Sequence, residues 1–208
     1  MKNQEDYIRD LAEIRSMMER SSKFMSLSGW AGILAGIYAL TGAYIAYVHL
    51  GFNPDQLFYD DKEAGDVYAD FTLLIALALV ILLLAIGTAI LLSTQKAQKR
   101  REKAWNATSK RLLMRMSVPL IVGGLLVLIL LSKGLVGLLA PLTLLFYGLA
   151  LYNASMFTYH EVKSLGIIQI CLGLMSTYFI SYGLFFWATG FGVVHIAYGI
   201  FMHLNYER

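Results

Sequence analysis

Four histidines are the residues of this sequence best suited to chemistry. His49 lies at the end of the first long apolar run, His160 and His203 lie at the ends of two later runs, and His195 lies within the last run. Imidazoles at one depth on facing helices can bind a haem iron from both sides. His160 and His203 would share a depth, so they are the candidate pair for haem or a metal. The alternative, which we expect, is that the histidines are interfacial or hydrogen-bonded and that the protein holds no cofactor.

Motifs of hydrolytic or metal-dependent catalysis are incomplete in this sequence. His160 and Glu161 begin an H-E-x-x-H pattern, but residue 164 is serine, so the zinc-protease motif fails. His195 and His203 are about 12 Å apart along a helix and cannot share one metal ion. Phosphate-loop, nucleophile-elbow and dinucleotide motifs are missing too. We therefore expect a non-enzymatic protein, with a lipid-modifying activity of His160, Glu161 and His203 as the enzymatic alternative.

Polar side chains within the apolar runs give a second possible site. Tyr178, His195 and Tyr198 could line a cavity between helices that holds a small apolar molecule or haem. Such a cavity would need a volume of roughly 300 Å³ or more. The alternative is that these groups form hydrogen bonds between helices, as buried polar groups in membrane proteins do.

The composition is that of a membrane protein. Of the 208 residues, 58% are hydrophobic and only 15% are charged, whereas soluble domains have about 25% charged residues. The apolar residues form runs of about 18 to 25, the length that crosses a hydrocarbon core of about 30 Å. No Asp, Glu, Lys or Arg lies at the centre of a run, which argues against carboxylate-based proton transport and intramembrane aspartyl proteolysis.

These runs predict an all-α fold with two parts. Residues 1–23 form an amphipathic helix, and residues 24–208 form a six-helix transmembrane domain. The expected spans are approximately residues 25–49, 70–92, 112–131, 135–158, 164–181 and 183–206. We divide the last two spans near residue 182, because a break near residue 190 would leave the last span too short.

The charges are sorted to one side of these spans. Residues 95–115 hold eight lysines and arginines against one glutamate, and cationic segments between spans stay in the cytoplasm. With both termini cytoplasmic, only Lys62 and Lys133 of the 17 basic residues lie outside. Nucleic-acid binding by so short a loop is not expected. Four loop cations are candidates for contact with lipid headgroups: Lys99, Arg100, Arg101 and Lys103.

The N-terminal segment has one apolar stripe. Tyr7, Leu11, Ile14 and Met18 follow one another at steps of three and four residues, which places them on one side of a helix. The polar side mixes acids and bases, whereas a helix held by anionic lipid would be richer in lysine and arginine. The stripe therefore predicts docking to a protein partner or a second copy, and lying on the membrane surface is the alternative.

Small residues mark the first span. Gly29, Gly32 and Gly36 lie on neighbouring turns, and such residues let helices approach closely in lipid. We expect them to pack helices within the bundle. Homodimerisation through this face is the alternative.

Two stretches of the chain carry a family resemblance. Residues 5–47 read EDYIRDLAEIRSMMERSSKFMSLSGWAGILAGIYALTGAYIAY, and residues 190–208 read GFGVVHIAYGIFMHLNYER. The chain resembles a family of bacterial inner-membrane proteins of roughly 200 residues with no assigned activity. The resemblance implies six helices. Taken with the residues above, we expect an accessory subunit of a membrane complex or a membrane-bound regulatory partner, with a small-molecule carrier as the alternative.

Overall fold

The computed structural model describes residues 26–50, 64–99 and 105–207 of the chain. Helices make up 90% of the structure, and no strand occurs in these ranges. The all-α prediction is therefore confirmed. Two sets of predicted contact residues lie outside the described ranges: Tyr7, Leu11, Ile14 and Met18 of the N-terminal stripe, and Arg100, Arg101 and Lys103 of the central loop.

Seven α-helices follow one another along the described chain. They are α2 (Gly29–Val48), α3 (Ala64–Lys99), α4 (Ala107–Ser132), α5 (Leu139–Ala154), α6 (Glu161–Tyr178), α7 (Gly183–Trp187) and α8 (His195–Tyr206). A π-helix, η5 (Ala188–Val194), joins α7 to α8, and short 3₁₀ turns are η2 (Val136–Leu138), η3 (Ser155–Phe157) and η4 (Ile180–Tyr182). Five segments are long and apolar enough to cross a membrane: Gly29–Val48, Thr72–Lys99, Ala107–Ser132, Val136–Phe157 and Ile180–Tyr206.

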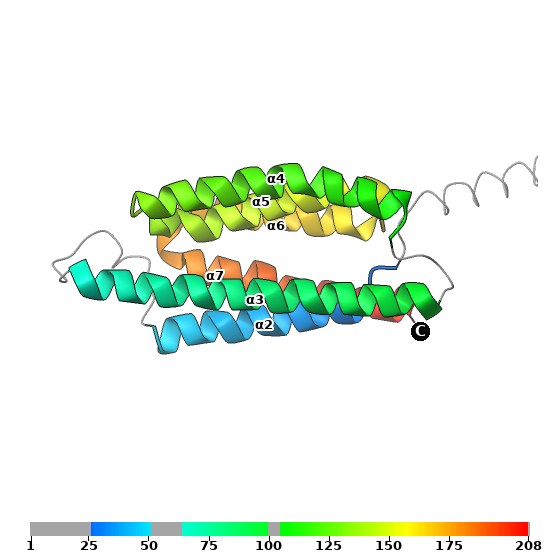
Figure 1. Cartoon of the computed structure of the whole chain (residues 1–208), viewed down its shortest axis with the longest axis horizontal. Coiled ribbons are helices and arrows are strands. Elements are labelled where there is room, and N and C mark those ends of the chain that lie inside the picture. The colour runs from blue at the N-terminus through cyan, green and yellow to red at the C-terminus, as the bar shows by residue number, and fades with distance from the viewer. Residues whose placement is uncertain (1–25, 51–63, 100–104, 208) are drawn as a thin grey trace, which may run out of the picture.

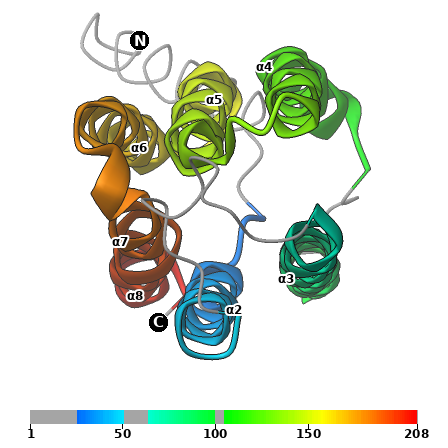
Figure 2. The same cartoon turned by 90° about the vertical axis from the view of Figure 1, so that its left-hand side faces the viewer.

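The helices lie side by side around an open ring. Figure 1 shows α4, α5 and α6 as one group and α2 and α3 as another, with α7 between the groups. In the end view of Figure 2 the order around the ring is α3, α2, α8 with α7, α6, α5 and α4. Of the lysines and arginines whose side chains the structure describes, all but Lys133 lie at the end where α3 finishes and α4 begins. We call this the basic end.

Helices α2 and α8 approach each other through glycines. A Cβ added to Gly29 would lie 2.5 Å from the Gly199 oxygen, and one added to Gly36 would lie 2.7 Å from the Gly192 oxygen. Gly32 faces the same surface, where a Cβ would lie 3.2 Å from the Gly199 Cα. Lipid gives helices no hydrophobic reason to associate, so close backbone contact supplies the attraction. The structure thus places all three glycines inside the bundle.

A second close contact joins α5 to α6. A Cβ on Gly148 would lie 2.7 Å from the Gly166 oxygen, and one on Gly166 would lie 2.8 Å from the Gly148 oxygen. Further along α6, a Cβ on Gly173 would lie 3.0 Å from the Pro141 oxygen. The two helices therefore stay in contact from the start of α5 to its last turns.

The turn after α4 depends on one glycine. Gly134 has a φ of 71°, a left-handed conformation that other residues rarely adopt. Its N–H donates to the Leu131 oxygen at 3.0 Å, and the Leu135 N–H donates to the Leu130 oxygen at 2.9 Å. These are the two bonds of a Schellman motif, which ends α4 and turns the chain into α5.

The outer surface of the bundle is apolar along most of its length. In the most apolar 18-residue window of α3 no residue is buried. Leu83 is 69% exposed and Leu91 is 61% exposed. Water would disfavour a helix this apolar on all sides, whereas the hydrocarbon of a bilayer accommodates it. The structure is that of a membrane protein.

The glycine contact between α2 and η5 predicts a large effect for one added methyl group. Gly36→Ala should lower the melting temperature in detergent by several degrees, because the new Cβ meets backbone atoms and overpacking costs about 1–3 kcal/mol. Gly124→Ala is the matched control, since nothing lies within 4 Å of its Cβ position. That variant should be neutral or slightly stabilised, because alanine favours helix. Equal melting temperatures for both variants would contradict this packing.

Candidate functional site

One carboxylate joins three segments of the chain at the basic end. Glu207 Oε1 accepts a hydrogen bond from the Gly29 N–H at 2.9 Å and lies 3.0 Å from the Lys96 ammonium. Its other oxygen, Oε2, accepts from His203 Nδ1 at 2.8 Å. The segments joined are the start of α2, the last turn of α3 and the end of α8. We call these four residues the Glu207 junction.

Lys96 attaches α3 to the rest of the bundle. Its ammonium also donates to the Leu27 oxygen and lies 5.7 Å from the centre of the Tyr159 ring. The Lys96 and Glu207 side chains are only 12% and 11% exposed, so water screens their attraction weakly. The apolar part of α3 is not buried. The ion pair between Lys96 and Glu207 and the contact with α2 therefore hold α3 in place.

The charge of Glu207 depends on its partners. Burial alone would raise the pKa of the Glu207 carboxyl. Hydrogen bonds from His203, Lys96 and the Gly29 amide, with the positive charge of Lys96, outweigh burial and lower the pKa from 4.5 to about 2. The carboxylate therefore stays ionised through the physiological range.

Tyrosines fill the interior beside the Glu207 junction. The Tyr206 hydroxyl donates to Glu161 Oε1 at 2.6 Å, and the Tyr206 and Tyr159 rings are 4.5 Å apart. Tyr159 is buried in an apolar cluster with Leu151, Val162, Leu165 and Met202, which come from α5, α6 and α8. This cluster closes the basic end of the bundle and links α8 to α5 and α6.

A second polar cluster lies deeper in the bundle, around His195. Its Nε2 is 3.0 Å from the Tyr147 hydroxyl, and its Nδ1 is 2.9 Å from the Gly190 oxygen. A carbonyl oxygen can only accept, so Nδ1 carries the hydrogen, and in the neutral ring Nε2 accepts from Tyr147. Gln169 Nε2 also donates to the Gly190 oxygen, at 2.7 Å. We call these side chains, with the Gly190 carbonyl, the His195 cluster.

The His195 cluster explains how the π-helix η5 is tolerated. A wider helical turn displaces a carbonyl from its regular partner, and inside a membrane a carbonyl without a donor is costly. The Gly190 carbonyl receives two side-chain donors, His195 from the same segment and Gln169 from α6. Gln169 Oε1 is buried without a hydrogen-bond partner, and a Cβ on Gly190 would lie 2.6 Å from it. The cluster is therefore tightly packed and structural in character.

The predicted site residues are only partly brought together. His195 and Tyr198 face the interior on α8, but Tyr178 lies at the far end of α6 and is 82% exposed. His160 is exposed at the start of α6. His203 belongs to the Glu207 junction, and the centre of its ring lies 5.4 Å from the centre of the Trp30 ring. No group of three or more His, Cys, Asp or Glu side chains suited to a metal occurs in the described part of the chain.

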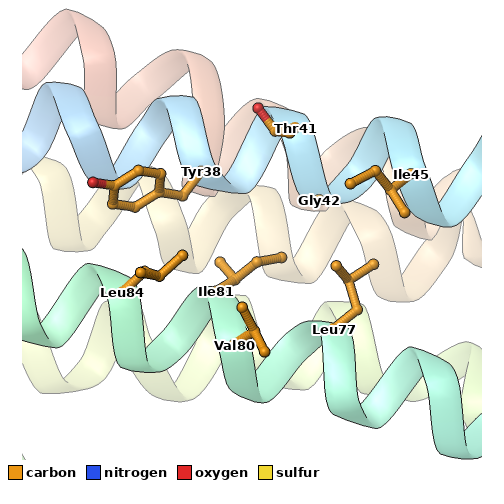
Figure 3. Close-up of a pocket in the computed structure, with 8 residues that line it drawn as sticks. All are labelled: Tyr38, Thr41, Gly42, Ile45, Leu77, Val80, Ile81 and Leu84. Carbon is orange, nitrogen blue, oxygen red and sulfur yellow. The ribbon is translucent and has the colours of Figure 1, made fainter.

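A small apolar cavity lies elsewhere, between α2 and α3. Its volume is about 160 Å³, below the roughly 300 Å³ typical of a small-molecule site. Figure 3 shows Ile81 of α3 pointing toward Gly42 of α2, and the cavity lies around this contact. Eight residues line it: Tyr38, Thr41, Gly42, Ile45, Leu77, Val80, Ile81 and Leu84. It is distinct from the predicted cavity at Tyr178, His195 and Tyr198.

His203 and His195 are candidates from the sequence, but three of their partners, Glu207, Lys96 and Tyr147, have no predicted role there. Glu207 lies four residues from His203, which is the helical spacing for a direct bond. No signal in the sequence pairs these residues, because each pair depends on which helix faces meet.

The low pKa of Glu207 predicts an acid-dependent loss of stability. Above about pH 4.5 the carboxylate is ionised in both the folded and unfolded states, and its bonds contribute fully. As pH falls toward about 2 the unfolded state binds a proton first, so this contribution disappears. Glu207→Gln should lower the melting temperature at pH 6 by about 5 °C, and the difference from the wild type should shrink below pH 4.5. A difference that is the same at pH 6 and pH 2.5 would contradict the assignment.

Comparisons with known proteins identify no relative of this chain. Models of protein families, curated proteins and solved structures were searched, and none matches this chain. The two polar clusters and the surface of the bundle are therefore the observations that bear on function.

Proposed function

We propose that the chain is a non-enzymatic inner-membrane protein that acts through protein contacts at its cytoplasmic face. In this proposal the bundle crosses the membrane six times, with the basic end in the cytoplasm. It serves as an accessory subunit of a membrane complex or as a membrane-bound regulatory partner. The resemblance to a family of bacterial inner-membrane proteins agrees with this location in the membrane.

The Glu207 junction is the observation that carries the proposal. Gly29 begins the helix that follows the N-terminal segment, Lys96 lies where the chain leaves α3 for the basic loop, and Glu207 lies beside the C-terminus. One carboxylate at the end of α8 thus fixes the two places from which the N-terminal segment and the basic loop would leave the bundle. Such a junction gives a protein-binding surface a rigid base, and a partner bound to one segment can act on the others.

The arrangement of the helices supports six spans. Five segments have the length and composition for crossing, and α6 stays in contact with α5 along its length through the glycine contacts described above. At about 1.5 Å per residue the 36 residues of α3 extend about 54 Å, more than the hydrocarbon core requires. Among the described residues, a basic end and an opposite end whose one cation is Lys133 fit the distribution of cations that keeps basic segments in the cytoplasm.

The partner surface that we propose is the apolar stripe of the N-terminal segment. Its four residues are Tyr7, Leu11, Ile14 and Met18, which helical spacing places on one side. An amphipathic helix lays such a stripe into an apolar groove of its partner. The mixed charges of the other side favour a protein over a lipid surface.

Crosslinking in the native host tests this function. The tagged chain is crosslinked in living cells, purified and compared with a variant in which Tyr7, Leu11, Ile14 and Met18 are all serine. The wild type should enrich a defined protein, or a differently tagged second copy, at least tenfold over the variant. Both chains should insert equally into the membrane, since residues 1–23 precede the first expected membrane span.

A matched variant controls for the number of changes and for net charge. Glu5, Arg9, Glu13 and Arg20 lie on the polar side of the same segment, and replacing all four with serine removes two acids and two bases. This variant should keep the partner. If the variant of the apolar stripe retained every protein that the wild type captures, the proposed function would be wrong.

A further inference from the structure

We propose that the first turns of α4 form a binding site for the headgroup of an anionic phospholipid, with the acyl chains lying along the same helix. The headgroup residues are Trp105, Lys110, Arg111 and Arg115. All four are exposed, and all lie at the basic end. The site concerns lipid and is independent of the protein contacts proposed above, because it requires only that α4 crosses the membrane.

The start of α4 is held in a fixed geometry. Asn106 and Ser109 form a capping box, with Ser109 N–H donating to Asn106 Oδ1 at 2.8 Å and Asn106 N–H donating to Ser109 Oγ at 2.9 Å. Trp105 precedes this cap and is 64% exposed, and the Lys110 ammonium lies 5.8 Å from its ring centre. Tryptophan prefers the level of lipid headgroups, so this pair places the start of α4 on the water side of Arg111 and Arg115.

An exposed stripe on α4 has the chemical order of a phospholipid. Arg111 and Arg115 are followed, at steps of three and four residues, by four exposed apolar side chains. These are Val118, Val122, Leu125 and Ile129. Guanidinium groups bind phosphate oxygens in pairs of hydrogen bonds, and the apolar side chains below suit hydrocarbon. The same stripe can therefore contact both the phosphate and the acyl chains of one phospholipid.

A different side of α4 contacts the bundle. Leu112, Pro119 and Gly123 are buried, and a Cβ on Gly123 would lie 2.5 Å from Phe146 of α5. The stripe through Arg111 and Arg115 is thus turned away from the neighbouring helix. Its side chains face the surroundings of the bundle.

Charge complementarity favours an anionic occupant. Glu161 and Glu207 are the acids at the basic end whose contacts the structure describes, and both are engaged, Glu161 with Tyr206 and Glu207 with Lys96 and His203. Within the described residues, these two acids are therefore not partners of the arginines of α4, which can bind a negative group from outside the described chain. An acidic protein segment would satisfy the charges but not the apolar stripe that continues toward the other end of the helix, so we assign the site to lipid.

Native mass spectrometry of the purified full chain tests the site. The protein in mild detergent is titrated with phosphatidylglycerol or with phosphatidylcholine of the same acyl chains. The wild type should bind the first phosphatidylglycerol more tightly than phosphatidylcholine. Arg111→Gln with Arg115→Gln should weaken phosphatidylglycerol binding about thirtyfold, because each cation near an anionic headgroup contributes about a factor of five.

The matched control removes the same charge elsewhere. Lys133→Gln with Lys163→Gln changes two cations outside the stripe, and this variant should bind phosphatidylglycerol within about twofold of the wild type. Three results would each overturn the proposal: equal affinity for the two lipids, equal weakening by the two double variants, or displacement of the lipid by an equal concentration of glycerol 3-phosphate. The last result would mean that the apolar stripe contributes nothing.

Discussion

Hydrocarbon offers no hydrogen-bond partner, so every polar group that a helix carries into a membrane must find one within the protein. The described part of this chain meets that requirement for most of its polar groups in two ways, while four buried atoms, Gln169 Oε1 among them, have no hydrogen-bond partner. Ionised groups gather at one end, where Glu207 binds Lys96, His203 and the first amide of α2. Inside the bundle, His195 and Gln169 both donate to the Gly190 carbonyl. The Glu207 junction stabilises the arrangement because it joins segments that are far apart in sequence.

The helices are held together by close contact of their backbones. Glycines bring α2 against α8 and α5 against α6, and the buried cluster around Tyr159 links these two pairs at the basic end. By contrast, α3 has a largely exposed surface and depends on α2 and on Lys96. Breaking the Lys96 bond would therefore release the end of α3 that leads into the basic loop. The bond between Lys96 and Glu207 therefore bears on both stability and the proposed function, because it also positions the segments that we propose bind a partner.

The fold class could be predicted from the sequence, since run length and composition depend on the bilayer alone. The packing role of Gly29, Gly32 and Gly36 follows from the same physics, and the structure places them against α8 and η5. The polar contacts could not be predicted, because they depend on the rotation of each helix about its axis. Tyr178 and Tyr147 look alike in sequence, yet the first is exposed and the second binds His195. The π-helix adds a residue to one turn, so regular spacing cannot locate it.

Labelling of single cysteines in intact cells tests most directly whether the chain sorts its charges across a membrane. In a Cys171→Ser background, Gln98→Cys places a thiol at the basic end and Ser132→Cys places one at the opposite end of α4. A membrane-impermeant maleimide added outside should label the Ser132→Cys variant at once and the Gln98→Cys variant only after the membrane is permeabilised. Labelling of both variants in intact cells, or of the Gln98→Cys variant alone, would contradict the account.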